Sequence, residues 1–252
     1  MSGPPVARPD RAAGARRWLA ALGAVLALAV VVAPLRSLAR TSEVANALQF
    51  AVLALAVPAL VVVGAPWRAL GGLGRLAERR AWRRARSSGT VALAGEVLVV
   101  VVWRTPGVVS AIGHHPWLLA VEAVTLVVAG VALWLELAAS PPMTPRTTVS
   151  RRIVLATVAM WTVWIVAYVA GMAHGQGYPG FHHHPGAGLS GVADKQLATA
   201  LLFAAAAAAY LPVVFASLFS WLGAEERAGT DAAPWVLRPE RGPRTDEVRA
   251  AG

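Results

Sequence analysis

Six long apolar stretches, joined by short connectors, constrain this chain more than any other feature of its sequence. A helix that crosses the hydrocarbon core of a bilayer needs about 20 mostly apolar residues. The sequence predicts six such helices, at residues 18–38, 44–63, 91–109, 116–137, 153–172 and 197–222. The predicted fold class is therefore all-α, a polytopic membrane protein with a bundle of six transmembrane helices.

The distribution of basic residues predicts which way the bundle faces. Of the 23 Lys and Arg residues, all but Arg36, Arg40, Arg104 and Lys195 fall on one side of the membrane if every apolar stretch crosses it. Cytoplasmic connectors are enriched in Lys and Arg. We therefore expect both termini to be cytoplasmic and the connectors near residues 39–43, 110–115 and 173–195 to face outward.

Composition limits the partners and the domain organisation. The net charge of +10 comes from basic residues beside the apolar stretches, where they meet anionic lipid, so it predicts membrane lipid and no nucleic acid as a partner. The absence of cysteine excludes disulfides and thiolate metal ligands. Residues 1–16 and 225–252 are rich in Pro, Gly and charge and are expected to be disordered, flanking a transmembrane domain at 17–224. The first apolar stretch is longer than that of a signal peptide, so we interpret it as a membrane anchor.

A few polar side chains interrupt the predicted helices, and such residues usually face the interior of a bundle. With a rise of about 1.5 Å per residue, most of them fall at one level in the outer third of the membrane. This set, the predicted polar cluster, comprises Asn46, Gln49, Arg104, Glu122, Asp194 and Gln196. It is either interhelical packing, including an Arg104–Glu122 pair, or the remainder of a ligand or metal site, and membrane energetics favour packing.

Glu96 is the exception in depth, because it falls in the inner half of its helix. Acids at this depth occur in proton relays, so Glu96 favours a transporter. No nucleophile–base pair or closely spaced pair of acids is apparent, and we expect no enzymatic activity.

All six histidines fall on the predicted outer side. Four of them lie in one Gly- and Pro-rich connector: His174, His182, His183 and His184. Imidazole and thioether groups suit copper, and Met172 precedes this connector. The spacing matches no known metal motif, so a solvated polar loop and a copper site both remain open, with the loop favoured.

Four short motifs, in order along residues 42–221, resemble those of the CtaG family of bacterial cytochrome c oxidase assembly factors, which are linked to copper insertion. The family's His-x-x-Gln-His corresponds to residues 46–50, followed by a Pro-containing apolar stretch at 58–66. Its Trp-His-x-Pro corresponds to 103–106, and its His-x-x-Glu-His to 119–123. Its Gly-Leu-Ser-Pro-Leu-Ala-Asp-Gln-Gln-Leu corresponds to 188–197, and a tyrosine follows at Tyr210.

The departures from the family are systematic. Five of its histidine positions hold other residues here: Asn46, Phe50, Arg104, Leu119 and Ala123. The acidic and amide partners Gln49, Glu122, Asp194 and Gln196 remain. The resemblance therefore implies a divergent member that has lost any intramembrane copper site.

The resemblance implies an assembly factor of the bacterial cell membrane that acts by binding a partner or copper at the outer face. Oxidase subunits or copper chaperones are the implied partners, and copper is the only implied cofactor. The alternative function is a small transporter or channel-like protein.

Overall fold

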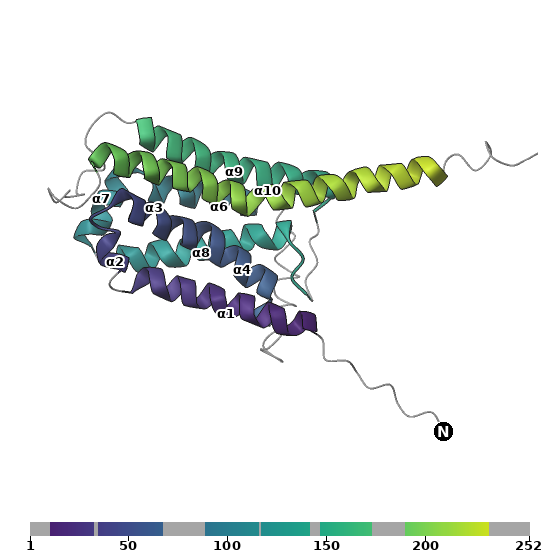
Figure 1. Ribbon diagram of the computed structural model, residues 1–252, viewed down its shortest axis with the longest axis horizontal. Coiled ribbons are helices and arrows are strands. Elements are labelled where there is room, and N and C mark those ends of the chain that lie inside the picture. Colours follow the sequence, from purple (N-terminus) through teal and green to yellow (C-terminus); the bar gives the residue numbers. More distant parts are fainter. Residues whose placement is uncertain are drawn as a thin grey trace, which may run out of the picture.

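The computed structural model describes residues 11–32, 35–67, 89–115, 117–141, 147–172 and 190–231 (Figure 1). The helices in these ranges are α1 (Arg11–Val31), α2 (Leu35–Leu38), α3 (Glu43–Ala51), the π-helical turn η1 (Val52–Ala56), α4 (Val57–Gly64), α6 (Gly89–Trp103), α7 (Pro106–His114), α8 (Leu118–Leu137), α9 (Val149–Met172) and α10 (Gly191–Asp231). The described residues contain no strand, which confirms the all-α class. Five helices are long and apolar enough to cross a membrane, or six if α6 and α7 form one span, which agrees with the predicted bundle.

Helices α1 and α10 extend into the segments that were predicted to be disordered. α1 begins at Arg11, inside the segment expected to be disordered, and ends at Val31, before the short helix α2. α10 has 41 residues, so it is about 60 Å long, twice the thickness of the hydrocarbon core. Figure 1 shows its C-terminal part extending beyond the other helices. The rest of the two predicted disordered segments lies outside the described residues.

The third predicted span is not the straight helix that residues 91–109 suggested. α6 and α7 meet at an angle of 69°. Pro106 opens α7, and Thr105 before it has extended backbone with ψ 130°, as residues that precede proline prefer. The bend leaves Arg104 in the turn between the two helices.

The second span contains a π-helical turn just before Pro58. The Val57 N–H donates to the Val52 carbonyl, five residues back, and Pro58 then lies in the first turn of α4, where its missing N–H is tolerated. Gly130 of α8 faces this segment. A Cβ atom on Gly130 would lie 2.5 Å from Pro58 Cγ and 3.1 Å from the Ala54 carbonyl oxygen, so α8 and the second span pack closer than any other residue would allow.

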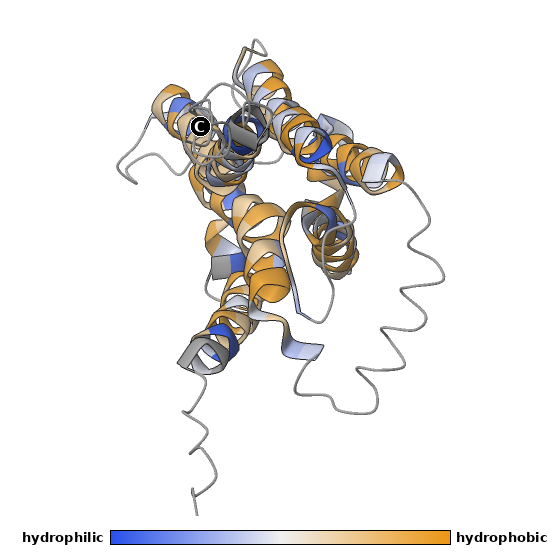
Figure 2. Cartoon of the chain, turned by 90° about the vertical axis from the view of Figure 1, so that its right-hand side faces the viewer, coloured by the Kyte–Doolittle hydropathy of each residue, from blue (hydrophilic) through white to orange (hydrophobic). Residues whose placement is uncertain are grey.

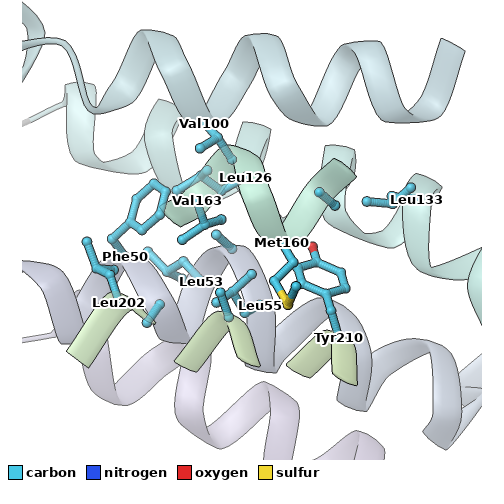
Figure 3. Close-up of a cluster of buried hydrophobic side chains, with 14 of the residues drawn as sticks. Phe50, Leu53, Leu55, Val100, Leu126, Leu133, Met160, Val163, Leu202 and Tyr210 are labelled. Atoms are coloured by element: carbon cyan, nitrogen blue, oxygen red, sulfur yellow. The ribbon is translucent and has the colours of Figure 1, made fainter. Parts of the chain in front are cut away.

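The core lies between the second span, α6, α8, α9 and α10. Figure 3 shows Phe50, Leu53 and Leu55 facing Val100, Leu126 and Val163 across this interior. Large apolar side chains on the outer faces, including Val124, Ile165 and Phe219, are exposed, as expected for surfaces that contact lipid. Apolar residues dominate the helices throughout (Figure 2).

Candidate functional site

The N-terminus of α3 is held by a carboxylate from the other end of the chain. Asp194, in the first turn of α10, accepts hydrogen bonds from the Ser42 hydroxyl at 2.9 Å and from the backbone N–H groups of Glu43 at 2.6 Å and Val44 at 3.2 Å. Ser42 is the N-cap of α3 and also accepts from the Ala45 N–H. Asp194 is 3% exposed. It therefore satisfies donors that α3 cannot satisfy itself, and it lies at the positive ends of two helix dipoles.

Arg104 binds the next turn of the same helix. Its Nη1 donates to the Asn46 side-chain oxygen at 2.7 Å, and its guanidinium carbon lies 5.1 Å from the centre of the Phe50 ring. Asn46 and Phe50 are four residues apart, so they lie on one face of α3. The buried guanidinium is thus held by a charge-assisted hydrogen bond and a cation–π contact, which limits the large penalty of a charge in this environment.

Glu122 reaches the same region from α8. Its side chain is buried. One helical turn further along α8, Thr125 accepts a hydrogen bond from the Trp103 indole at 2.8 Å, which ties α8 to the end of α6 beside Arg104. The predicted pairing of Arg104 with Glu122 stays a prediction at the level of a direct ion pair.

The predicted polar cluster is therefore not one constellation. Gln49 turns away from Arg104, and its side-chain N–H donates to the carbonyl of Val30 on α1. Gln196 is exposed on α10. The remaining members form two contacts along α3: the cap at Asp194 and the Arg104–Asn46–Phe50 group, with Glu122 near it. α3 is thus bound by polar contacts to α1, to the α6–α7 turn and to α10.

His114 and His115 take no part in these contacts. His114 and His115 are exposed at the end of α7, while His174, His182, His183 and His184 lie outside the described residues. Among the residues that the structure describes, no group of three His, Cys, Asp or Glu side chains is placed to hold a metal ion.

Two contributors to these contacts were missed by sequence reasoning. Ser42 is followed by Glu43 and then by the predicted span from residue 44, and a serine before an acidic first turn is a usual signature of an N-cap, so this signal could have identified it. Thr125 gave no signal, because a lone threonine in an apolar helix most often bonds its own backbone, as Thr125 also does to Val121.

Comparison with known proteins identifies the family of this chain. A family model for the cytochrome c oxidase caa3 assembly factor matches residues 5–224. The chain belongs to this family of oxidase assembly factors. No curated protein and no solved structure matches it.

Membership in the oxidase assembly factor family raises the question of whether the residues present suit copper. Three of the five positions expected to hold histidine converge in space, because Arg104 contacts both Asn46 and Phe50. Leu119 is buried on α8, and Ala123 lies one turn further along. An amide, a phenyl ring, a guanidinium and two aliphatic groups offer no imidazole or thiolate, and the guanidinium would repel a cation. These positions do not fit copper.

Proposed function

We propose that this assembly factor acts by binding a partner of the oxidase machinery at the outer face of the membrane, without copper inside the bundle. The observation that carries the proposal is the Arg104–Asn46–Phe50 group. The positive charge in this group is the Arg104 guanidinium, which Asn46 and Phe50 already bind. A metal ion at the same place would need ligands of its own, and these side chains are occupied. Any copper would then be held by the outward connector with His174, His182, His183 and His184.

The rigid part of the proposed docking surface is the end of the bundle at which α3 and α10 begin. The hydrogen bonds of Asp194 hold the N-termini of α3 and α10 together. The hydrogen bond from Trp103 to Thr125 holds the C-terminal end of α6 against α8. A surface that positions a partner benefits from such fixed elements, because less freedom is lost on binding. Oxidase subunits and copper chaperones are the partner classes that the family suggests.

A photo-crosslinking experiment tests the proposal. A photoreactive residue at Thr41 or His115, both exposed at the predicted outer end, should crosslink to an oxidase subunit or copper chaperone in intact cells. The matched position is Thr148, exposed at the other end of the bundle, which should give no such product. Crosslinks to the oxidase machinery from Thr148 alone would place the partner on the opposite face and overturn the proposal.

The second candidate, a small transporter or channel-like protein, is favoured by one observation. Glu96 is 2% exposed, and neither of its carboxylate oxygens has a hydrogen-bond partner among the described residues. Substrate or ion flux in proteoliposomes that is lost in Glu96→Gln would support transport. Flux unchanged by that substitution would remove the reason for this candidate.

A further inference from the structure

Three buried polar side chains on three different helices lack hydrogen-bond partners among the described residues. They are Glu96 on α6, Trp134 on α8 and Tyr210 on α10, and the unpartnered atoms are both carboxylate oxygens, the indole Nε1 and the phenol oxygen. Their exposed fractions are 2%, 5% and 0%. An unsatisfied buried donor or acceptor costs about 1–3 kcal/mol, and more if it is charged, so three in one region need an explanation.

The three groups form one neighbourhood. The rings of Trp134 and Tyr210 stack with centroids 5.8 Å apart and planes 15° apart, and α6, which carries Glu96, packs against α8, which carries Trp134. Figure 3 shows the Tyr210 ring beside Met160, with its hydroxyl turned away from α10 toward the middle of the bundle.

The directions of the helices bring the polar ends together. Helical side chains lean toward the N-terminus of their own helix. α6 runs from the predicted inner end to the outer end, so Glu96 leans inward, while Trp134 and Tyr210 lean outward because α8 and α10 run the opposite way. The inner ends of α6 and α8 are level, since a Cβ on Gly89 would lie 3.6 Å from Glu136 Cγ.

In the part of the chain that the structure describes, no charged side chain forms an ion pair or hydrogen bond with Glu96. On the helices that pack around α6, the charged groups of the inner half are Glu136 on α8 and Arg151 and Arg152 on α9. Arg151 donates to Thr90 and Arg152 to the Thr147 carbonyl, both at the inner end of α6. Glu96 lies six residues beyond Thr90, about 9 Å along the helix axis. η1 and α4 have no titratable side chain, and α10 contributes Tyr210.

The three polar groups, a carboxyl, a phenol and an indole N–H, suit water and a proton as ligands. One carboxyl and one phenol supply too few oxygens for a metal cation, which takes four to eight ligands. A buried water makes about three hydrogen bonds to polar groups that would otherwise be unsatisfied. An isolated carboxylate in an apolar interior is so unfavourable that the group takes up a proton instead.

We propose that Glu96, Tyr210 and Trp134 form an internal site that holds a proton on the Glu96 carboxyl group and at least one bound water that joins it to the phenol and the indole. The site is independent of the proposed partner binding at the outer face. It would give this half of the bundle a hydrated acid within about 10 Å of the predicted cytoplasmic end.

Infrared spectroscopy of the purified full-length protein in lipid tests the site. At neutral pH the wild type should show the carbonyl band of a protonated carboxyl group that shifts in D2O and is missing in Glu96→Gln. Tyr210→Phe and Trp134→Phe should each move this band, because each removes a hydrogen bond transmitted through the water. An O–H stretching band that shifts in H2(18)O should be lost in Glu96→Gln.

Matched substitutions separate the site from general perturbation. Tyr168→Phe and Trp161→Phe alter exposed side chains on α9 and should leave the Glu96 band in place. Glu96→Gln keeps the shape of a neutral acid, so its thermal unfolding temperature should not fall below that of the wild type. A protonated carboxyl band that survives in Glu96→Gln, or a Glu96 band that neither Tyr210→Phe nor Trp134→Phe moves, would overturn the proposal.

Discussion

The Asp194 carboxylate lies 2.9 Å from the Ser42 hydroxyl, although 152 residues separate them in the chain. This contact joins the start of α10 to the start of α3, and the same carboxylate accepts from two backbone N–H groups of α3. The first and last parts of the core are therefore joined at one buried carboxylate, and the stability of α3 depends on a residue of another helix.

Asp194→Ala should destabilise the protein by about 2 kcal/mol or more, because it leaves the donors at the start of α3 without a partner. The measurement is thermal or denaturant unfolding of the purified protein in detergent. Gln196→Ala, exposed two residues away, should change stability by less than about 0.5 kcal/mol. In a double-mutant cycle, Ser42→Ala and Asp194→Ala should be non-additive. Equal effects of Asp194→Ala and Gln196→Ala would mean that the contact contributes nothing.

Gly130→Ala should lower the unfolding temperature, because its Cβ would lie 2.5 Å from the Pro58 ring and 3.1 Å from a backbone carbonyl. Neither neighbour is the flexible end of a side chain, so the helices must separate, which typically costs about 1–3 kcal/mol. Gly95→Ala is the matched control, since nothing lies within 4 Å of its added Cβ. It should be neutral or stabilising by up to about 1 kcal/mol, as alanine is the better helix former. The same effect from both changes would show that α8 and Pro58 are not closely packed.

The sequence predicted the helices well because each has to be long and apolar to cross a bilayer, and that signal is local. The sequence marks Pro106 as one of four prolines at which a helix can bend, but it does not tell which of the four does. Pro34, Pro58, Pro106 and Pro212 all interrupt apolar stretches, yet α10 continues through Pro212 and the second span absorbs Pro58 with a π-helical turn. Whether a proline bends a helix depends on what packs beside it, which a single sequence does not contain.

The structure brings only part of the predicted polar cluster into contact. Counting residues along a helix predicts depth, and α3 contacts both Arg104, through Asn46, and Asp194, through its first backbone N–H groups. Rotation about the helix axis decides the partner, and it turns Gln49 toward α1 and Gln196 outward. That rotation is set by tertiary packing, and an apolar helix with no polar face gives little indication of it.

Arg104 and Glu122 are expected to be energetically coupled. Glu122→Ala should lower folded yield more than Glu122→Ala combined with Arg104→Ala, because the single change leaves a buried guanidinium with less compensation. A charge in hydrocarbon costs about 2.5–3.5 kcal/mol on insertion scales, which is ample for a visible difference in yield. Asn46→Ala should resemble Glu122→Ala, since Asn46 accepts from the same guanidinium. Yield is measured by size-exclusion chromatography of the detergent extract, and additive losses in the double variant would show that the two charges are not partners.

The orientation of the bundle can be measured with cysteine labels, since the native chain has no cysteine. Ser87→Cys should be protected from a membrane-impermeant thiol reagent in intact cells and react after lysis, because the basic connector that contains it is predicted to be cytoplasmic. Ala187→Cys, in the connector that contains the histidines, should react in intact cells. The reverse pattern would invert the topology and move the proposed docking surface to the cytoplasm.

Copper binding, if measurable, should reside in the outward connector alone. Replacing His174, His182, His183 and His184 with alanine should abolish it, whereas Gln49→Ala should leave it unchanged, because Gln49 bonds the Val30 carbonyl. Affinity should be modest, since a Gly-rich connector loses conformational entropy when its histidines gather around one ion. Copper affinity should weaken as the pH falls through about 6.5, where imidazole takes up a proton and ceases to be a ligand.

Equilibrium dialysis followed by metal analysis gives the copper stoichiometry at each pH. Stoichiometric copper on the four-histidine variant would place the ion inside the bundle and contradict the argument from Arg104, Asn46 and Phe50.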